Sequence, residues 1–401
     1  MKNFRTVWLL IYSLAMFFPA ACTQADQLPG LTVREGQFYK DGKPFRGIGI
    51  NYFTALVRMT GIEGGPANLT DTSSFQGLET LKTYEIPFVR FCAGGFFPKD
   101  WDLYLNDKAA YFAAFDRLVA KAEKCNIGLI PSLFWYFATI PDLVGDPVDQ
   151  WGNPDSKTIA FMRQYTTEVV SRYRNSPAIW AWEFGNEYLH AADLPTPESG
   201  RGWVIPELGT PGERTARDKM VRKNVYIAYR IFAETVRALD AARPVFSGDA
   251  MTRSCAFHNH TETNWIPDSA AEWTQMFLQD NQAMSALSAH FYYYDASEKQ
   301  DAGVAEYGPA AQMKLLMEIS REAGKPLWIG EFGPVNRARS PAEERQQFET
   351  MLGLIESNQV PLSALWNFDF EHKDQVIWNI TTTNRRAYML DALRNANRRI
   401  K

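Results

Sequence analysis

The sequence of 401 residues contains only four cysteines and five histidines, and it has no excess of positive charge. Three cysteines lie beyond the N-terminal segment, and so small and odd a number excludes a disulfide framework. With a net charge of −4, the chain lacks the basic stripe that a nucleic-acid-binding protein requires. It also has no internal repeat, no low-complexity block and no linker that would divide it. One large globular domain is therefore expected.

A long apolar run lies at the N-terminus. A basic region precedes VWLLIYSLAMFFPAA, which is short for a membrane span, so the pattern predicts a signal peptide over residues 1–21. A polar tether over residues 22–30 follows. Cys22, preceded by two alanines, resembles the first mature residue of a bacterial lipoprotein, and plain cleavage near Ala25 is the alternative. Either way we expect an exported bacterial protein that is periplasmic, extracellular or anchored in the outer membrane.

From residue 46 onward, short apolar strands alternate with helices whose apolar residues recur every three or four positions. A hairpin with the turn Asp41-Gly42 precedes them. Eight strands alternating with eight helices predict an α/β fold, a (β/α)8 TIM barrel, as one domain over residues 31–401. The alternative is a doubly wound open sheet, but no Gly-rich phosphate-binding sequence follows the first strand. The strands are expected at residues 47–51, 87–91, 128–133, 179–184, 244–247, 286–290, 327–329 and 363–366, and the helices at 74–85, 109–125, 159–173, 224–240, 272–284, 310–324, 341–358 and 387–400.

Long connections follow the predicted carboxyl ends of four strands, whereas the opposite connections are short. In a barrel of this kind the connections after the strands form the face that carries the active site. On this topology Cys92 and Cys125 lie at opposite ends of the barrel, so we expect no disulfide between them. The long connections are expected at residues 136–158, 188–219, 249–271 and 367–384.

Two glutamates stand at the ends of apolar strands. IWAWEFGNEYL places Glu187 at the end of the fourth strand, and KPLWIGEFG places Glu331 at the end of the seventh. These strands face each other across the mouth of the barrel, so the two carboxylates can converge on one space. Either glutamate alone is as easily explained by solvation or by an arginine partner. As a facing pair they are the minimal equipment for cleaving a glycosidic bond.

Other polar and aromatic residues follow the neighbouring strands. Arg90 ends the second strand, where a fixed cation would keep a nearby carboxylate ionised. His290 and Tyr292 lie beyond the sixth strand, and both can form hydrogen bonds to carboxylates. Trp366 ends the eighth strand as a flat surface for a sugar ring. Asn186, beside the first glutamate, offers an amide for a sugar hydroxyl.

The motifs GNE, HFY and GEFG, together with the tryptophan of the eighth strand, resemble the retaining β-glycosidases of the (β/α)8 clan, in particular glycoside hydrolase family 5. That family includes endoglucanases and endo-β-mannanases, and the resemblance extends from about residue 34 to the end. It implies a double displacement with Glu187 as acid/base and Glu331 as nucleophile. It further implies that Asn186 binds the 2-hydroxyl, that Tyr292 and Arg90 support the nucleophile, that His290 positions the acid/base, and that Trp366 forms the floor of the −1 subsite.

Several further residues are open to two interpretations. The family often has a histidine after the third strand, where this chain has Phe134, Trp135 and Tyr136. Tryptophans in the strand-end loops are candidates for outer sugar-binding subsites, although each can equally pin its own loop. The sequence CAFHNH places Cys255 close to two histidines, but without a second ligand cluster a loop without metal is favoured. The outer-subsite candidates are Trp135, Trp151, Trp203 and Trp378.

The expected function is hydrolysis of a β-linked glycan, with an oligo- or polysaccharide as the partner and no cofactor or metal. A non-catalytic surface carbohydrate-binding protein on the same barrel is the alternative. A metal-dependent hydrolase would need histidine pairs at strand ends, and only His290 stands at one. We expect a monomer that meets the membrane only through a lipid on Cys22. The sequence does not distinguish β-mannan from β-glucan, or endo from exo action.

Overall fold

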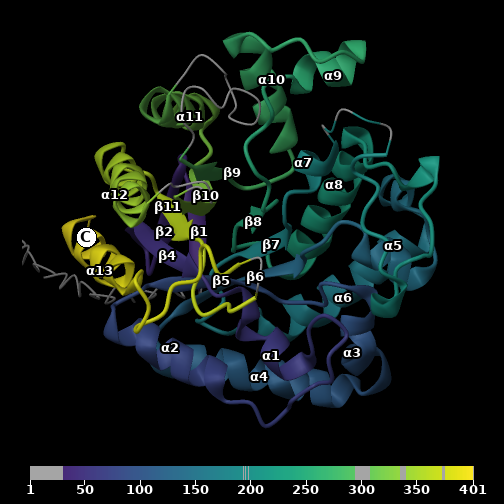
Figure 1. The fold of residues 1–401 in the computed structure, drawn as a ribbon, viewed down its shortest axis with the longest axis horizontal. Helices are drawn as coiled ribbons and strands as arrows, with labels where there is room; N and C mark the ends of the chain where they lie inside the picture. Colours follow the sequence, from purple (N-terminus) through teal and green to yellow (C-terminus); the bar gives the residue numbers. More distant parts are fainter. Residues whose placement is uncertain are drawn as a thin grey trace, which may run out of the picture.

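The computed structural model describes residues 30–192, 194, 196, 198–293, 308–334, 340–372 and 375–400. These residues form eight parallel strands surrounded by helices, which confirms the predicted (β/α)8 barrel (Figure 1). The predicted signal peptide, Cys22 and the tether up to residue 29 lie outside the described residues. In the described part of the chain, no helix is both long enough and apolar enough to cross a membrane. The strands are β4 (Gly47–Asn51), β5 (Phe88–Cys92), β6 (Gly128–Phe134), β7 (Trp182–Gly185), β8 (Val245–Phe246), β9 (Leu287–Tyr292), β10 (Leu327–Gly333) and β11 (Leu362–Leu365).

The barrel strands pair in the order β8-β7-β6-β5-β4-β11-β10-β9. The two edge strands approach each other where the Ser285 N–H donates to the Val245 carbonyl at 2.9 Å, so the barrel is nearly closed. The first predicted strand matches β4 residue for residue. The fourth begins later than predicted, because Ile179 forms only an isolated bridge with Leu129.

The eight predicted helices are all present and surround the strands. Polar caps begin several of them. Asp107 accepts a hydrogen bond from the Ala110 N–H, and Ser269 forms a capping box with Glu272. Five shorter helices were not predicted, and they lie in the connections. The helices are α1 (Val57–Thr60), α2 (Ser73–Thr83), α3 (Asp102–Asn106), α4 (Lys108–Cys125), α5 (Thr139–Val144), α6 (Lys157–Tyr173), α7 (Tyr188–Ala192), α8 (Arg222–Leu239), α9 (Ala256–Glu262), α10 (Ala270–Asp280), α11 (Pro309–Ala323), α12 (Pro341–Ser357) and α13 (Ala387–Ile400).

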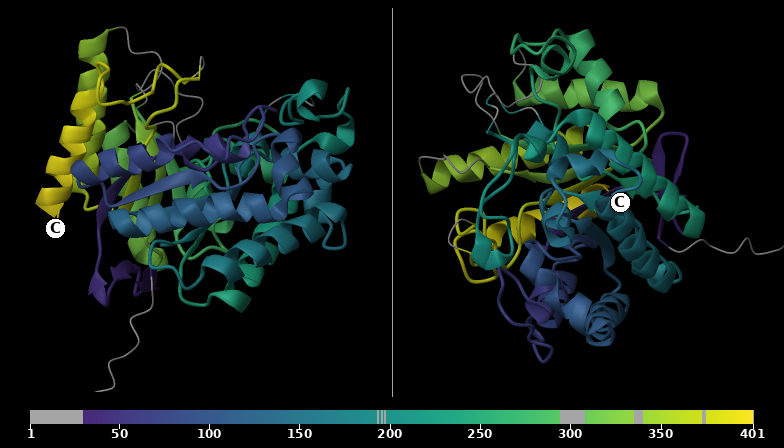
Figure 2. Two further views of the ribbon diagram at one scale, coloured as in Figure 1. Left: turned by 90° about the horizontal axis from the view of Figure 1, so that it is seen from below. Right: turned by 90° about the vertical axis from the view of Figure 1, so that its right-hand side faces the viewer.

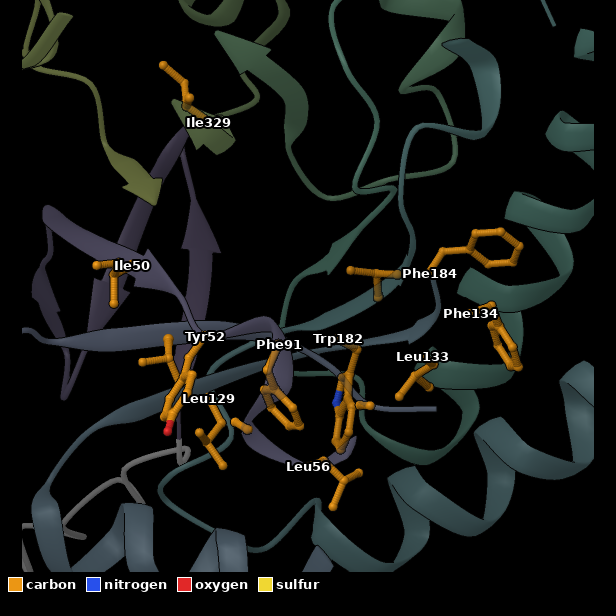
Figure 3. Close-up of a cluster of buried hydrophobic side chains, with 14 of the residues drawn as sticks. Ile50, Tyr52, Leu56, Phe91, Leu129, Leu133, Phe134, Trp182, Phe184 and Ile329 are labelled. Atoms are coloured by element: carbon orange, nitrogen blue, oxygen red, sulfur yellow. The ribbon is translucent and has the colours of Figure 1, made fainter. Parts of the chain in front are cut away.

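The largest hydrophobic cluster fills the space between the strands and the helices. Alternate strand residues point outward into it, among them Phe91, Trp182 and Phe184 (Figure 3). Because side chains alternate along a strand, the residues between them point into the barrel. Residue 183 therefore points inward, between two outward-pointing aromatic side chains.

A small antiparallel sheet closes the amino-terminal end of the barrel. It consists of β1 (Leu31–Arg34), β2 (Gln37–Lys40) and β3 (Lys43–Pro44), and the last two strands are joined by the predicted turn. The first of these strands was not predicted. Leu31 and Phe38 are buried against interior residues of the barrel strands, including Phe88 of β5 and Trp328 of β10. In Figure 2 this sheet, in purple, lies at one end of the barrel.

The three cysteines of the described part are buried, and Cys92 and Cys125 are free thiols. Cys92 ends β5 and Cys125 ends α4, in agreement with the prediction that these two residues do not pair. Burial raises the pKa of the Cys92 thiol to about 12. The Cys92 thiol therefore contributes as a small apolar side chain.

Candidate active site

Glu331 is directed into the barrel by an irregularity in β10. Trp328 points into the barrel and Ile329 points outward, so regular alternation would turn residue 331 outward as well. A register shift between Ile329 and Glu331 instead sets the glutamate beside His290 of β9. A Cβ on Gly330 would lie 2.9 Å from the His290 Nε2, so this position requires glycine. The sequence WIGE thus produces the inward turn.

Glu187 is held by a turn at the end of β7. The Gly185 N–H donates to the Ser247 carbonyl at 3.2 Å, and the Glu187 N–H donates to the Gly248 carbonyl at 3.1 Å. Glu187 has a φ of 53°, in the left-handed region. A non-glycine residue adopts this conformation only when its surroundings impose it, as they do here.

The two glutamates converge on His290. The His290 Nδ1 lies 2.8 Å from Oε1 of Glu187 and 3.6 Å from Oε2 of Glu331. One oxygen of each carboxylate and one ring nitrogen all lie within 4.8 Å of one another. Glu331 is nearly buried, whereas the side chain of Glu187 is 36% exposed. The predicted pair therefore faces one space at the mouth of the barrel.

Arg90 lies below this space and is completely buried. Its Nη1 donates to Oε1 of Glu331 at 2.9 Å, and its Nη2 donates to Oδ1 of Asn186 at 2.8 Å. The guanidinium carbon also lies 4.5 Å from the ring centroid of Trp135. Although burial alone would lower the pKa of Arg90, Glu183 and Glu331 raise it above its ordinary value. This cation therefore stays charged beside Glu331.

Sequence reasoning missed two residues of the site, Glu183 and Asn51. Glu183 is fully buried and accepts a hydrogen bond from the Arg90 Nε at 2.6 Å and another from the Trp328 Nε1 at 2.9 Å. Asn51 accepts a hydrogen bond from Arg90 at 3.1 Å and donates to the Gly330 carbonyl at 2.9 Å. The strand alternation in WAWEFG carried a signal for Glu183, because both of its neighbours are large aromatic residues. The single positive charge of Arg90 is therefore shared by two carboxylates, those of Glu183 and Glu331.

Tyr292 and Trp366 complete the inner site. The Tyr292 hydroxyl donates to Oε2 of Glu331 at 2.6 Å, so both carboxylate oxygens of Glu331 accept hydrogen bonds. Trp366 is 8% exposed, and its Nε1 donates to Oε1 of Gln375 at 3.0 Å. It belongs to a small aromatic cluster with Trp135 and Tyr292 at the carboxyl ends of the strands. The site thus presents a flat aromatic side beside two carboxylates.

The chain matches the family model described as cellulase (glycosyl hydrolase family 5) over residues 43–372. It belongs to glycosyl hydrolase family 5. The protein is accordingly a glycoside hydrolase. No curated protein sequence matches it.

Solved structures with a similar fold include mannanases and an endoglucanase. An endo-1,4-beta-mannanase from Rhizomucor miehei has a TM-score of 0.62 and 16% identity, covering 92% of this chain and 99% of that one. An endo-beta-1,4-mannanase from Thermotoga petrophila has a TM-score of 0.57 and 16% identity, covering 90% of this chain and 78% of that one. An endoglucanase from Pseudomonas stutzeri has a TM-score of 0.51 and 12% identity, covering 87% and 93%. At these identities the matches establish the shared fold.

His290 is electrically neutral in this family 5 hydrolase near neutral pH. Burial lowers its pKa to about 4, and the nearby positive charge of Arg90 adds to this, although Glu331 opposes it. A neutral ring carries one N–H, so when Glu187 is ionised the Nδ1–H donates to it. His290 therefore fixes the position of Glu187 without adding a charge beside it.

The group formed by Glu187, His290 and Glu331 has a geometry that can hold a metal ion, and it is the only such group in the described part of the chain. However, Arg90 already places a positive charge 2.9 Å from Glu331, and Tyr292 donates to the other oxygen. A cation would compete with both donors, so the chemistry of this group favours a carboxylate pair over a metal centre. Cys255 and the two nearby histidines do not form a group of this kind among the described residues.

The four tryptophans that are candidates for outer subsites differ in how far they are buried. Trp151 is fully buried and its Nε1 donates to the Phe137 carbonyl, so the expectation that it stacks on an outer sugar is wrong. It packs its own loop against the core instead. Trp135 is 4% exposed and lies against Arg90, within the inner site. Trp378 is partly buried, with its ring centroid 6.5 Å from that of Tyr292, whereas Trp203 is 52% exposed.

Proposed function

We propose that this protein hydrolyses β-linked glycans of the mannan or glucan type with retention of anomeric configuration. The observation that carries the proposal is that one carboxylate oxygen of Glu187 lies within 4.8 Å of one carboxylate oxygen of Glu331. Retaining glycosidases hold their two carboxyl groups about 5–5.5 Å apart, whereas inverting enzymes leave about 6.5–9.5 Å for a water molecule. An oxygen of Glu187 within 4.8 Å of an oxygen of Glu331 is nearer to the retaining than to the inverting arrangement, which supports a retaining mechanism.

In the first step Glu331 attacks the anomeric carbon while Glu187 gives its proton to the leaving oxygen. Arg90 and Tyr292 donate hydrogen bonds to the two oxygens of Glu331, which orients the nucleophile. The buried position of Glu331 and the more exposed position of Glu187 suit these roles, because the acid must exchange protons with water.

In the second step Glu187, now a carboxylate, takes a proton from a water molecule that attacks the glycosyl–enzyme bond. Glu331 leaves as a carboxylate and Arg90 again stabilises its charge. His290 keeps its hydrogen bond to Glu187 during this stage, because the ring is neutral and its Nδ1–H is the donor. Asn186, whose Oδ1 accepts a hydrogen bond from Arg90, donates its amide N–H to a hydroxyl of the bound sugar.

The choice of mannan or glucan rests on the similar structures, two of which are described as mannanases and one as an endoglucanase. Trp366 and Tyr292 can pack against a pyranose ring of either kind, because mannose and glucose both have an apolar C–H face. A screen of β-mannan, β-glucan and the matching aryl β-glycosides decides between the two.

The decisive experiment replaces Glu331 by glutamine, which keeps the shape of the side chain but not its nucleophilicity. We expect kcat on an activated aryl β-glycoside to fall by at least about 10³-fold with an unchanged melting temperature. NMR of the first-formed product of the wild-type enzyme should show the β-anomer. A matched control is Glu318→Gln on α11, whose side chain is 41% exposed and remote from the barrel mouth, and kcat should stay at the wild-type value.

A Glu331→Ala variant supplied with azide sharpens the assignment of roles. If Glu331 is the nucleophile, azide attacks from the vacated side and the product is the α-glycosyl azide. Full activity of Glu331→Gln would refute the mechanism. Binding of glycans by the wild-type protein without any turnover would favour the non-catalytic carbohydrate-binding alternative.

A further inference from the structure

The segment that follows β8 holds the turn that carries Glu187. Its three consecutive residues 247–249 accept hydrogen bonds from alternate residues of that turn. The first two acceptors are backbone carbonyls, and the second of them, on Gly248, accepts from the Glu187 N–H at 3.1 Å. The third acceptor is a side chain, because Oδ1 of Asp249 accepts from the Leu189 N–H at 2.9 Å. Asp249 therefore continues the contact where the backbone pairing ends.

The Leu189 N–H needs an acceptor from another segment. Glu187 has a φ of 53°, which turns the chain out of the strand, and α7 begins at the next residue. The first N–H groups of a helix have no acceptor within that helix, and the Leu189 N–H is one of them. Leu189 is only 4% exposed, so bulk water does not replace the missing acceptor. The carboxyl group of Asp249 supplies it.

Asp249 is itself held in place by α8. Its Oδ2 accepts a hydrogen bond from the Tyr229 hydroxyl, and α8 packs against α7 (Figure 1). The side chains of both residues are buried. Burial raises the pKa of Asp249 to about 7, although the hydrogen bonds from Tyr229 and Leu189 oppose this increase. The carboxyl group therefore has one fixed position, and that position determines where α7 begins.

Stability alone does not explain a carboxyl group at this place. Moving a carboxyl group out of water costs free energy, and an apolar side chain of similar size would avoid that cost. Such a side chain would lack only the acceptor for Leu189, which lies two residues beyond Glu187. His290 fixes the side chain of Glu187 through Oε1, whereas Asp249 fixes the backbone that follows it. The acid/base is thus held at both ends.

We propose that Asp249 is a positioning residue for the acid/base Glu187. It fixes the start of α7, and with it the backbone from which the Glu187 side chain reaches the leaving oxygen. Because Asp249 is buried, it acts only through Glu187 and does not touch the substrate. A displacement of about 1 Å in a catalytic group can lower a rate about 100-fold, so such support matters. This inference rests on the proposed function and extends it to a residue of another strand.

The test compares two aryl β-glycosides of the disaccharide that the wild-type enzyme cleaves, one with a 2,4-dinitrophenyl and one with a phenyl leaving group. Dinitrophenolate leaves without a proton, whereas phenol needs the proton of Glu187. We expect Asp249→Leu to lower kcat/KM at least about 10-fold for the phenyl glycoside and less than about 2-fold for the dinitrophenyl glycoside. Asp249→Asn keeps an oxygen acceptor for Leu189 and should stay within about 2-fold of wild type for both.

Azide gives a second measurement, on the step in which Glu187 acts as a base. In Asp249→Leu the glycosyl–enzyme should accumulate, because water attacks slowly without a well-placed base. Azide needs no base: its nitrogen bonds to the anomeric carbon, the bond to Glu331 breaks, and Glu331 leaves as a carboxylate. Azide should therefore raise the kcat of Asp249→Leu on the dinitrophenyl glycoside and yield the β-glycosyl azide. The wild-type kcat should not change.

Asp240→Leu is the matched control for the loss of a buried carboxylate. Asp240 is 8% exposed and accepts a hydrogen bond from the Trp182 Nε1 at 2.9 Å, so it contacts β7 at the end opposite to Glu187. This variant should have a lower melting temperature than the wild type. The ratio of its two kcat/KM values should stay at the wild-type value.

The outcomes separate this inference from the proposed function. If Asp249→Leu does not fold, Tyr229→Phe decides, because it releases only Oδ2 of Asp249, and the same selective loss of at least about 3-fold is expected. Equal losses on both glycosides, or no loss on the phenyl glycoside, would refute the positioning role, while cleavage by the wild type upholds the proposed function. If the wild-type protein cleaves no glycoside, both fall.

Discussion

The two ends of the barrel use the same strands in opposite ways. At the amino-terminal end, Phe88 of β5 and Trp328 of β10 meet Leu31 and Phe38 of the small sheet in an apolar layer. Two or three residues further along the same strands, Arg90 and Glu331 form a buried ion pair. The lower layer gains free energy by leaving water, whereas the upper layer loses free energy by burying charge.

This contrast indicates that burial of the apolar layer offsets the free energy cost of burying the charged residues of the site. Buried ion pairs seldom stabilise a protein, so the cluster around Arg90 must be supported by its surroundings. One contact joins the layers directly, because the Trp328 Nε1 of the lower layer donates to Glu183 of the upper one at 2.9 Å. The apolar end therefore acts as a rigid base for the polar end, and the two can be perturbed separately.

The largest effect is expected from removal of the cation in the upper layer. Arg90→Ala leaves Glu183 and Glu331 buried without their partner, so we expect the free energy of unfolding to fall by about 3–5 kcal/mol and activity to be lost. Urea denaturation and assays on an aryl β-glycoside measure the two effects.

Arg90→Lys is the informative companion, because it keeps the charge but not the planar set of donors that reaches four side chains. It should fold more stably than Arg90→Ala yet lose at least about 100-fold in kcat. Wild-type kcat in the lysine variant would contradict a positioning role for the guanidinium.

A smaller effect, on stability alone, is expected at the lower layer. Phe38 is 1% exposed, with its ring centroid 5.8 Å from that of Phe246. Phe38→Ala should lower the free energy of unfolding by about 3–4 kcal/mol. The kcat of the folded enzyme should not change, because no catalytic side chain is touched.

Tyr39→Ala provides the matched control, since the next residue of β2 is only partly buried on the opposite face. Its effect on stability should stay below about 1 kcal/mol. A large fall in kcat for Phe38→Ala, well below its melting temperature, would mean that the two layers are not separable.

The smallest expected effect is a dependence of the free energy of unfolding on pH, and it arises from Asp249 at the edge of the upper layer. Asp249 follows β8, accepts a hydrogen bond from the Leu189 N–H at 2.9 Å and another from the Tyr229 hydroxyl. Burial raises its pKa to about 7, so the folded protein keeps this proton over a range in which the unfolded chain releases it. The contribution of Asp249 to stability therefore falls as the pH rises from about 4 to 7.

His290 acts in the opposite direction. Its pKa is lowered to about 4, so between about pH 4 and 6.5 the unfolded chain binds more protons and stability rises with pH. Each group changes the free energy of unfolding by at most about 1.4 kcal/mol per pH unit. In Asp249→Asn the opposing contribution is gone, so the stability of the variant relative to wild type should increase with pH up to about 7. Parallel denaturation curves across this range would show that Asp249 is ionised in the folded state.

Several errors of the sequence-based prediction have a common physical cause. Glu183 and Asn51 were missed because each stands within an apolar strand sequence, where the partner that justifies a buried polar residue is distant along the chain. Trp151 was assigned to a sugar subsite because its loop follows a barrel strand, yet it is fully buried. The solvent exposure of a side chain depends on which other segments of the chain cover it. The local sequence pattern around the residue does not predict this.

The sequence by itself determined the alternation of strands and helices, the closed parallel sheet and the two strand ends that carry Glu187 and Glu331. These features follow from local periodicity and from residues that end apolar segments, and both are visible along the chain. Only the tertiary structure decided that Glu331 turns inward through the irregularity at Gly330, that Arg90 is shared by Glu183 and Glu331, and that Trp203 remains exposed. Those outcomes depend on contacts between strands and loops far apart in sequence, whose geometry is fixed only when the barrel closes.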